Sequence, residues 1–326
     1  MNQKKFLVTG GAGYIGSHIV KHLGAIGAKL IILDNLSTGY EKSVLFGELI
    51  KGDLSDRSLL ESLFQNHRFD AVLHFAGSIV VPESVLKPNL YYENNTENSL
   101  NLLRCCEKFG VKNFIFSSTA AVYGLAESGS CHEKSPLAPI NPYGRSKLMV
   151  EWMLEDFARA NNFNYVALRY FNVAGADYKS KLGQFNPKAT HLIKIACQVA
   201  TGKSQQMEIY GTDYNTPDGT CIRDYIHVDD LADAHVLALK YLLDGGKSQV
   251  LNCGYNKGFS VREVLGAVQE IIQKPFRIVE SKRRLGDSPK LVAESAKIRE
   301  VLNWKPQKEN LLDIVRSAYQ FEQNLT

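Results

Sequence analysis

The sequence of 326 residues predicts an α/β protein built on a doubly wound parallel sheet, with a smaller C-terminal α/β lobe. From Phe6 to about Arg169, short apolar runs alternate with amphipathic stretches, which is typical of parallel strands joined by crossover helices. A glycine-rich turn follows the first apolar run, and the regular alternation ends after Asn172. These observations favour one large sheet followed by a lobe of less regular elements.

The expected strands are short apolar runs, and the expected helices are stretches in which apolar residues recur every three or four positions. Asn141 is a favourable N-cap and Pro142 suits a first helical position, so the helix that begins at residue 142 has the strongest support. The strands are predicted at 6–9, 30–33, 45–50, 71–75, 113–117, 165–168 and 249–252, and the helices at 14–23, 58–65, 90–109, 142–160, 229–243 and 261–272.

The chain length and the end of the regular alternation after Asn172 predict two domains. Residues 1–172 are expected to form the sheet domain, and residues 173–326 the smaller domain, some segments of which return to the first. Ligands of doubly wound sheets bind beyond the carboxyl ends of the strands. The residues expected to converge at this edge are Gly10, Asp34, Gly77, Ser118 and Tyr143.

The charges and the cysteines argue against several classes of protein. The formal net charge of +4 is spread along the chain, and the basic cluster at residues 282–284 is too short for a nucleic-acid tract. The six cysteines show neither C-x-x-C nor zinc-ligand spacing, so we expect no metal, no disulfide framework and a reducing compartment. Apolar runs are too short for a signal peptide or a membrane span, which predicts a cytoplasmic protein without a membrane partner.

Gly10, Gly13 and Gly16 stand between the first expected strand and the helix that begins at Tyr14. A glycine-rich turn in this place lets the backbone approach a pyrophosphate at a helix N-terminus, as in Rossmann-type dinucleotide sites. The G-x-x-G-x-x-G spacing is one residue wider than the usual fingerprint and is similar to that of the short-chain dehydrogenases. The first domain is therefore expected to bind a dinucleotide.

Asp34 ends the second expected strand, about 20 residues beyond the glycines, where a carboxylate can accept hydrogen bonds from an adenosine ribose. Residues 35–38 include no cation that could meet a 2′-phosphate, so NAD is favoured over NADP. Asp53, after the third strand, has two interpretations: it could bond the adenine amine, or it could simply start a loop.

Tyr143 and Lys147 form a Tyr-x-x-x-Lys pair on the helix that begins at residue 142. Residues four apart share a helix face, so the ammonium can lie near the phenol and favour its ionised form, a usable base for an alcohol proton. The hydroxyl residues 117–119 end the fifth strand, and we expect Thr119 to bond the substrate oxygen. The pair alone would fit a solvated helix face; beside the glycine turn it indicates redox chemistry on a hydroxyl group.

A resemblance to a known family rests on an ordered set of motifs. They are Thr9-Gly10-Gly11-Ala12-Gly13-Tyr14-Ile15-Gly16-Ser17-His18, Phe116-Ser117-Ser118, Tyr143-Gly144-Arg145-Ser146-Lys147, Arg169-Tyr170-Phe171-Asn172 and Arg223-Asp224-Tyr225-Ile226-His227-Val228. In this order they resemble the UDP-glucose 4-epimerase family of extended short-chain dehydrogenases/reductases. The matches run from Phe6 to about Trp304, and the ordered set is far more specific than any one motif.

The resemblance implies interconversion of UDP-glucose and UDP-galactose without net redox change. A bound NAD would take hydride from sugar C4, the 4-keto sugar would rotate, and hydride would return to its other face. Tyr143 would act as base and then acid, Lys147 would hold the nicotinamide ribose and lower the pKa of the phenol, and Thr119 would bond the same sugar hydroxyl. Residues 1–172 would bind NAD, and residues 173–326 the UDP-sugar.

The resemblance also implies two sets of binding residues. Guanidiniums suit a diphosphate and a tyrosine ring can stack on uracil, although each residue taken singly also fits an ion pair, a core position or a helix cap. NAD would contact Gly10, Gly13, Tyr14, Ile15, Gly16, Asp34, Asn35, Asp53, Leu54, Phe75, Ala76, Gly77, Asn94, Ser117, Tyr143, Lys147 and Tyr170, and the UDP-sugar would contact Thr119, Tyr143, Asn172, His191, Leu192, Tyr210, Arg223, Arg284 and Asp287.

Other activities remain open at this point. UDP-GlcNAc/GalNAc, UDP-xylose/arabinose or UDP-glucuronate could be the epimerised pair. A 4,6-dehydratase would need an acid to protonate the leaving hydroxyl, and Ala120 and Ala121 follow Thr119. A non-catalytic NAD-binding module would need none of the hydroxyl, Tyr and Lys set.

The resemblance further implies a homodimer formed by the helices at 90–109 and 142–160. The apolar surface of these helices could be larger than the area that the sheet covers. The apolar residues concerned are Leu100, Leu103, Met149, Trp152 and Met153. The alternative is that these side chains pack entirely within the subunit.

Overall fold

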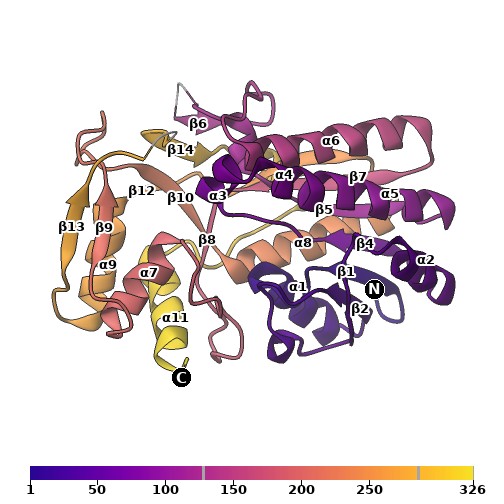
Figure 1. Cartoon of the computed structure of the whole chain (residues 1–326), viewed down its shortest axis with the longest axis horizontal. Coiled ribbons are helices and arrows are strands. Elements are labelled where there is room, and N and C mark those ends of the chain that lie inside the picture. The colour runs from indigo at the N-terminus through magenta and orange to yellow at the C-terminus, as the bar shows by residue number, and fades with distance from the viewer. Residues whose placement is uncertain (127–128, 285–286, 326) are drawn as a thin grey trace. The chain divides into compact units, whose positions relative to one another are not determined.

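The computed structural model describes residues 1–126, 129–284 and 287–325. It consists of two compact units, each assembled from separate segments of the chain (Figure 1). Unit 1 comprises Met1–Val122, Pro139–Arg169 and Ala232–Leu251, and unit 2 comprises Tyr123–Ala138, Tyr170–Leu231 and Asn252–Thr326.

Unit 1 is built on a 7-stranded sheet with the order β11-β7-β5-β4-β1-β2-β3. The pairs β1–β2, β2–β3, β1–β4 and β4–β5 are parallel. The chain builds outward from β1 through β2 to β3 and then returns to the other side of β1, so the order reverses between β1 and β4. The strands are β1 (Lys5–Thr9), β2 (Lys29–Asp34), β3 (Glu48–Lys51), β4 (Ala71–His74), β5 (Asn113–Thr119), β7 (Asn164–Tyr170) and β11 (Gln249–Cys253).

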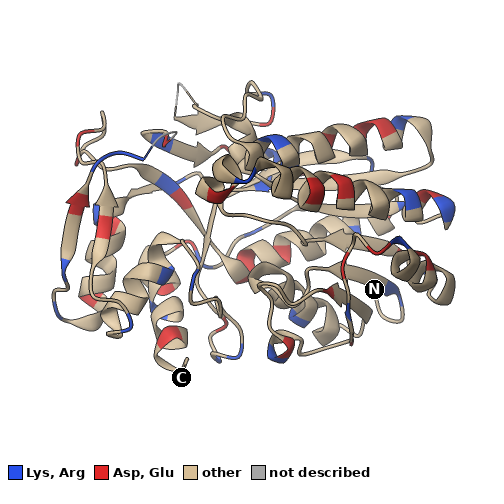
Figure 2. Ribbon diagram, viewed as in Figure 1, with Lys and Arg blue, Asp and Glu red and all other residues tan. Residues whose placement is uncertain are grey.

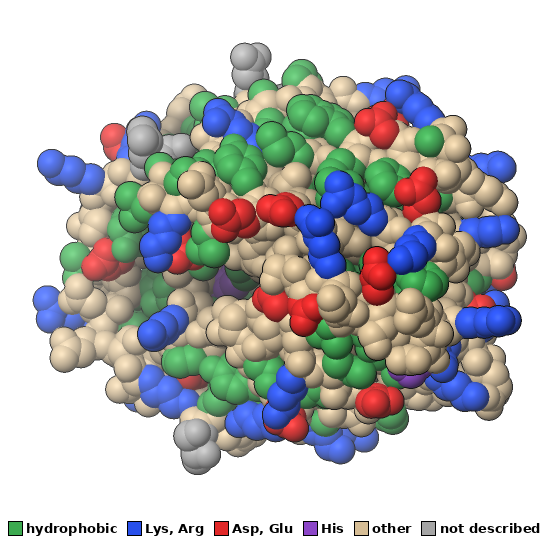
Figure 3. Space-filling model, turned by 45° about the vertical axis from the view of Figure 1, so that its right-hand side comes forward, with side chains coloured by type: hydrophobic (Ala, Val, Ile, Leu, Met, Phe, Trp, Pro, Cys, Tyr) green, Lys and Arg blue, Asp and Glu red, His purple; other side chains and the backbone are tan. Residues whose placement is uncertain are grey.

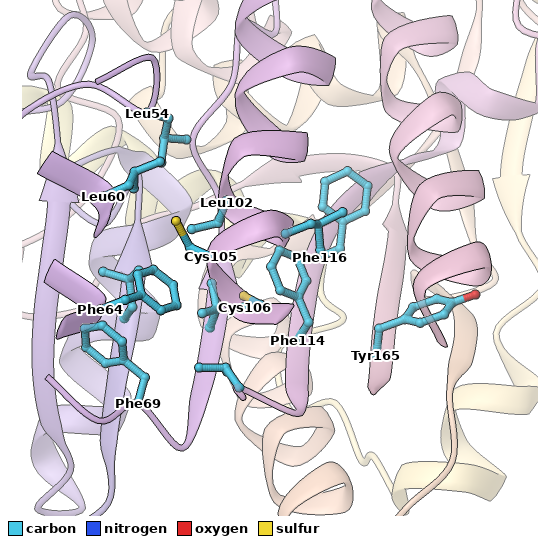
Figure 4. Close-up of a cluster of buried hydrophobic side chains, with 14 of the residues drawn as sticks. Leu54, Leu60, Phe64, Phe69, Leu102, Cys105, Cys106, Phe114, Phe116 and Tyr165 are labelled. Atoms are coloured by element: carbon cyan, nitrogen blue, oxygen red, sulfur yellow. The ribbon is translucent and has the colours of Figure 1, made fainter. Parts of the chain in front are cut away.

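Long helices cover this sheet, in agreement with the predicted doubly wound class. Leu60, Phe64, Leu102 and Phe114 belong to one buried apolar cluster between the helices and the strands (Figure 4). Burial of such side chains is the main stabilising contribution to the unit. The helices are α1 (Tyr14–Ala25), α2 (Arg57–Asn66), α3 (Val81–Leu86), α4 (Pro88–Tyr91), α5 (Asn98–Lys108), α6 (Pro142–Ala160) and α8 (Val228–Leu243), the last of which begins in unit 2.

Two predicted elements of unit 1 were wrong in their extent. The strand predicted at 45–50 begins only at Glu48, because Gly47 adopts a φ of +85° that interrupts an extended run. The single helix predicted at 90–109 is divided into α4, a π-helical turn at Tyr92–Glu97 and α5. A π-helical turn shifts the side chains that follow it around the helix axis, and such turns are frequent at functional sites.

Unit 2 contains a 5-stranded sheet with the order β12-β10-β14-β6, in which β8 also pairs with β10. A separate pair, β9–β13, is parallel, and α7, α9 and α11 pack against one another. The strands are β6 (Ser130–Cys131), β8 (Asn172–Ala174), β9 (Met207–Tyr210), β10 (Ile222–His227), β12 (Gly258–Ser260), β13 (Ile278–Ser281) and β14 (Lys290–Ala293), and the helices are α7 (Leu192–Ala200), α9 (Val261–Ile272), α10 (Ala296–Leu302) and α11 (Leu311–Gln323).

Figure 2 shows Lys and Arg distributed over many elements and interspersed with Asp and Glu. Within the described ranges, no helix combines the length and apolar character needed to cross a bilayer. The same ranges hold no group of three or more His, Cys, Asp or Glu side chains arranged to bind a metal ion. All six cysteines are buried free thiols.

Candidate active site

The glycine-rich turn of unit 1 joins β1 to α1 and lies against the segment that follows β4. Gly10 has a φ of +71°, and a Cβ there would lie 2.4 Å from the Ala76 backbone nitrogen. A Cβ at Gly16 would lie 2.3 Å from the Gly10 carbonyl oxygen. Gly10 and Gly16 are therefore required for close packing of the turn.

Gly13 serves a different purpose, because it is the N-cap of α1 and has no side chain to cap the first helical turn. A Cβ at Gly13 would meet only the Gly10 carbonyl oxygen, at 3.3 Å. Tyr14 and Ile15 are the first residues of α1. The first-turn amides of a helix attract an anion, so this turn fits the pyrophosphate of a dinucleotide.

Asp34 is the last residue of β2 and is buried beside the turn. Its carboxylate accepts hydrogen bonds from the backbone N–H of Ala12, at 2.9 Å, and of Leu36, at 2.8 Å. Burial raises the pKa of Asp34, and these backbone bonds oppose that rise. Each carboxylate oxygen has a second lone pair, so Asp34 can hold the turn and still accept a ribose hydroxyl.

Asp53 and Asn35 lie near each other on the surface after β3 and β2. The Asn35 amide donates to Asp53 at 2.6 Å, and the Ser55 backbone N–H donates to Asp53 at 2.9 Å. The Ser55 bond forms a local turn that agrees with the second interpretation of Asp53, that of a loop-starting residue. Leu54, which follows, is buried in the apolar cluster of unit 1.

Phe75, Ala76 and Gly77 follow β4 and are half-buried. The next residue, Ser78, is held by the π-helical turn: Asn94 donates to its hydroxyl at 2.9 Å, and its backbone N–H donates to Asn95 at 2.7 Å. The π-helical turn thus fixes the segment that follows residues 75–77, which the resemblance implies contact NAD.

Tyr143 is the second residue of α6, whose N-cap Asn141 accepts a hydrogen bond from the Gly144 backbone N–H at 2.8 Å. Burial raises the pKa of the Tyr143 phenol, and a side-chain hydrogen bond from the Thr119 hydroxyl lowers it. The ring of Tyr91 packs edge-on against the Tyr143 ring, with 6.4 Å between centroids. The structure therefore brings together the phenol and the hydroxyl that the sequence predicted to share one substrate oxygen.

Lys147 is almost fully buried, one helical turn after Tyr143. Its ammonium donates to the Ser117 carbonyl oxygen at 2.7 Å and lies 4.7 Å from the centre of the Phe116 ring. Burial lowers the pKa of Lys147 to about 8, and the negative charge of Glu151 opposes this shift. Burial thus makes this ammonium easier to deprotonate than that of an exposed lysine.

That Lys147 lowers the pKa of the phenol stays a prediction, because burial and the hydrogen bond from Thr119 are what shift the pKa of Tyr143 in the protein alone. Burial dominates at Tyr143, and its pKa is raised. The Lys147 ammonium is engaged by the Ser117 carbonyl. Helical spacing places two side chains on one face, but it does not decide which group each of them contacts.

In unit 2, several residues predicted to bind the UDP-sugar form one cluster. Arg284 donates to Asp287 at 3.1 Å, and its guanidinium lies 4.7 Å from the centre of the Tyr210 ring. Arg223 lies 3.7 Å from Asp287 and donates to the Ser288 carbonyl at 2.8 Å. Two guanidiniums and an exposed tyrosine ring suit a nucleoside diphosphate.

The remaining predicted residues of unit 2 lie on other elements. Asn172 begins β8 beside β10, His191 is the N-cap of α7, and Leu192 is the first residue of that helix. Burial lowers the pKa of His191, and within the described residues its Nδ1 has no hydrogen-bond partner. His191 can therefore offer a neutral ring nitrogen to a ligand. Tyr170, predicted to contact NAD, is the half-buried last residue of β7.

Two polar groups near the catalytic pair were missed in the sequence. Asn95, beside the predicted Asn94, bonds both Ser78 and the Ser146 hydroxyl, at 3.0 Å. Glu151 lies one turn after Lys147 and is buried against Arg169. The position of Glu151 could have been found, since helical spacing puts residues 143, 147 and 151 on one face. The contacts of Asn95 depend on the π-helical turn, for which the sequence carries no periodic signal.

Known proteins similar to this chain match it over nearly its whole length. A UDP-glucose 4-epimerase of Azospirillum brasilense is 53% identical over 98% of this chain and 92% of that relative. The crystal structure of a Brucella ovis UDP-glucose 4-epimerase in complex with NAD has a TM-score of 0.95 and 42% identity, covering 98% of both chains. A Bifidobacterium longum UDP-glucose 4-epimerase in complex with NAD+ and UDP has a TM-score of 0.93 and 36% identity, with 98% of both chains covered.

The sheet order, the glycine turn and the Thr–Tyr–Lys set define a dinucleotide-binding protein of the short-chain dehydrogenase/reductase type. The sequence profile of the NAD dependent epimerase/dehydratase family matches residues 6–254. The chain therefore belongs to that family and, by its similarity to the relatives above, to the UDP-glucose 4-epimerases within it.

Proposed function

We propose that this chain interconverts UDP-glucose and UDP-galactose by inversion at sugar C4 through a 4-keto intermediate, with a bound and recycled NAD. The observation that carries the proposal is the Thr119 hydroxyl bonded to the Tyr143 phenol, with Lys147 one turn along the same helix. Its membership of the NAD dependent epimerase/dehydratase family supports both the cofactor and the reaction class.

NAD would be held by unit 1. Its pyrophosphate fits the turn at Gly10 and Gly13, its adenosine ribose fits Asp34, and its nicotinamide side would face Gly77 and Lys147. When bound, the oxidised nicotinamide accepts a hydride from an alcohol carbon and can return it. The carboxylate of Asp34 disfavours a 2′-phosphate, which selects NAD over NADP.

The proton is handled by Tyr143. As a phenolate, Tyr143 would take the proton of the C4 hydroxyl while the carbinol is oxidised, and as the resulting phenol it would give that proton back when the carbonyl is reduced. Thr119 donates to the phenol oxygen, which favours the phenolate, and can bond the same sugar oxygen.

The UDP-sugar would be held by unit 2. Arg223 and Arg284 would bond the diphosphate, Asp287 would orient both guanidiniums, and Tyr210 would stack on the uracil. Asn172, His191 and Leu192 would line the remainder of this site. Residues 1–172 and 173–326 are accordingly proposed as the NAD-binding and UDP-sugar-binding domains, with α8 and β11 contributing residues to the first.

We also propose a homodimer formed through the predicted helix regions 90–109 and 142–160, to which we add α3 because it packs against α6. Of the apolar residues predicted for the interface, Leu103 is fully buried and Met153 packs on the core of unit 1, whereas Trp152 is 53% exposed. Val85 and Leu86 on α3 are 58% and 81% exposed, and α3 packs against α6. Figure 3 shows hydrophobic side chains on one face of the protein, interspersed with charged ones. Exposed apolar side chains on two helices that pack together favour a partner surface.

The dimer predicts a change of mass when a charge is placed on this surface. Leu86→Asp should convert the protein from a dimer to a monomer in sedimentation at micromolar concentration, because an unpaired carboxylate is costly at an apolar interface. Leu125→Asp is the matched control, since Leu125 is 56% exposed in unit 2 and should leave the mass unchanged. A wild-type protein that sediments as a monomer would refute the proposed dimer.

A cytoplasmic location is proposed as well. All six cysteines carry free thiols, and unpaired cysteines persist in reducing compartments.

The proposed activity is tested by incubating the purified protein with UDP-galactose, with and without added NAD, and following the products by NMR. Formation of UDP-glucose is expected, because the Thr119, Tyr143 and Lys147 set is suited to reversible oxidation of the C4 carbinol. Conversion only of UDP-xylose/arabinose, of UDP-glucuronate or of UDP-GlcNAc/GalNAc would contradict the substrate assignment. Failure to convert any UDP-sugar would contradict the catalytic one.

A further inference from the structure

Glu151 extends the catalytic face of α6 by one turn beyond Lys147. It is 4% exposed, and its carboxylate accepts a hydrogen bond from the Ser118 hydroxyl at 2.5 Å. Arg169 donates to the same carboxylate from Nε, at 3.0 Å and 3.2 Å, and from Nη2 at 2.5 Å. Arg169 is 3% exposed, so this is a buried ion pair with a neutral hydroxyl bonded to its acid.

These contacts tie α6 to two adjacent strands, because Ser118 lies on β5, Arg169 lies on β7, and β5 and β7 are neighbours in the sheet. Ser118 stands between the two strand residues that serve the catalytic pair. Ser117 accepts the hydrogen bond of Lys147 through its carbonyl, and Thr119 bonds the Tyr143 phenol. A carboxylate fixed to Ser118 therefore holds the end of β5 in register with both catalytic side chains.

A buried ion pair of this kind is weak evidence of a stabilising role. Removing two charges from water is costly, and apolar residues of similar volume often serve stability equally well or better. The pair instead fixes the orientation of the Glu151 carboxylate, because a guanidinium and a carboxylate bond in a fixed planar geometry. The arrangement of Glu151 and Arg169 thus indicates that the site requires a carboxylate in a fixed position rather than additional stability.

The titratable groups of the neighbouring elements also indicate that the charge of Glu151 matters. His74 on β4 is neutral, since burial and the charge of Lys147 lower its pKa to about 3. On β7, Arg169 is a second cation, and burial raises the pKa of Tyr165 to about 12. Burial likewise raises the pKa of the Tyr143 and Tyr91 phenols, on α6 and α4, so both are neutral in the free protein. Among these groups, Glu151 is the anion that favours the ammonium form of Lys147.

We propose that Glu151 is a positioning residue for the catalytic pair: its carboxylate holds the end of β5 against α6 and supplies the counter-charge that keeps Lys147 an ammonium. The inference rests on the proposed function for the roles of Tyr143 and Lys147, and extends it to a residue that touches neither substrate nor cofactor.

The test is Glu151→Gln, which preserves size and removes the charge. Without that charge the pKa of Lys147 falls below its present value of about 8, so the ammonium is lost at lower pH. The alkaline limb of kcat/KM for UDP-galactose should move down by about one pH unit. At pH 8, kcat should fall about fivefold, with KM within about twofold of wild type. Activity should recover in part at pH 6.5, where Lys147 is protonated again.

Glu155→Gln is the matched control, because Glu155 lies one turn further along α6 in an exposed pair with Arg159. It should retain the wild-type pH profile. A Glu151→Gln profile equal to wild type, or a loss of kcat that is the same at every pH, would overturn the counter-charge role. Absence of turnover in the wild-type protein would instead contradict the proposed function, so the two failures are distinguishable.

Ser118→Ala separates the geometric role from the charge and serves if Glu151→Gln does not fold. It removes only the hydroxyl that joins β5 to Glu151 and leaves the pair with Arg169 in place. The expected result is a kcat several-fold lower, with KM and the alkaline limb unchanged. An unchanged kcat in Ser118→Ala would overturn the positioning role.

Discussion

Tyr143→Phe is expected to reduce kcat for UDP-galactose by about 10³-fold, because it deletes the group that moves the hydroxyl proton. The ring remains and can still pack edge-on against Tyr91. NAD affinity should change little, since the turn at Gly10 and Gly13 and the carboxylate of Asp34 are untouched. Stopped-flow turnover and a fluorescence titration with NAD measure the two quantities separately.

Tyr165→Phe is the control for the loss of a phenol hydroxyl. Tyr165 is buried in unit 1, and Figure 4 shows its hydroxyl pointing away from the other labelled side chains. This variant should turn over at the wild-type rate. Turnover by Tyr143→Phe within about tenfold of wild type would remove Tyr143 from the role of base, because general acid–base catalysis accounts for about 10²–10⁴-fold.

Gly10→Ala is expected to lower the free energy of unfolding by more than about 3 kcal/mol and to abolish NAD binding. The added Cβ would lie 2.4 Å from the Ala76 nitrogen and 2.7 Å from the Phe75 carbonyl carbon. Both are backbone atoms, so the strand end after β4 would have to move away from the turn. That movement would open the site at the β1–β4 switch point, where the sheet order reverses.

Gly110→Ala is a matched control for Gly10→Ala. Gly110 has a φ of +70°, close to the +71° of Gly10, but a Cβ there would have nothing within 4 Å. Gly110→Ala should lower the free energy of unfolding only by the strain of an alanine in the left-handed conformation, about 1–2 kcal/mol. NAD binding should remain intact. Urea unfolding and NAD titration of both variants provide the comparison. Equal losses in the two variants would contradict a steric role for Gly10.

The helices with complete local signals were predicted from the sequence with their observed bounds. The helix at 142–160 begins at Pro142, directly after the capping residue Asn141. The helix at 261–272 begins after Ser260, which forms a capping box with Glu263. In both cases the information lies within a few residues of the helix end. The doubly wound class followed equally from local patterns, because buried parallel strands are continuous apolar runs.

The features that escaped prediction depend on contacts between distant residues. The π-helical turn at Tyr92–Glu97 brings Asn94 and Asn95 to Ser78, a segment that precedes it by more than a helical turn. The hydrogen bond from Lys147 to the Ser117 carbonyl is set by how α6 packs on β5. Neither arrangement has a periodic or compositional signature.

Strand β11 illustrates the same limit at the level of topology. Its apolar run at 249–252 was predicted, but the sequence did not place it in a particular sheet. In the structure, β11 is the edge strand of the 7-stranded sheet beside β7. Strand order depends on which side of the sheet each crossover takes, and a long intervening segment leaves that choice open.

The central claim is that one C4 hydride leaves the sugar and returns to the same carbon from the other face. It is tested most directly with UDP-galactose that carries deuterium at C4, incubated with the purified protein and NAD in ordinary water. The account predicts UDP-glucose that retains deuterium at C4, because Tyr143 exchanges only the hydroxyl proton with its surroundings. UDP-glucose with protium at C4 would contradict it.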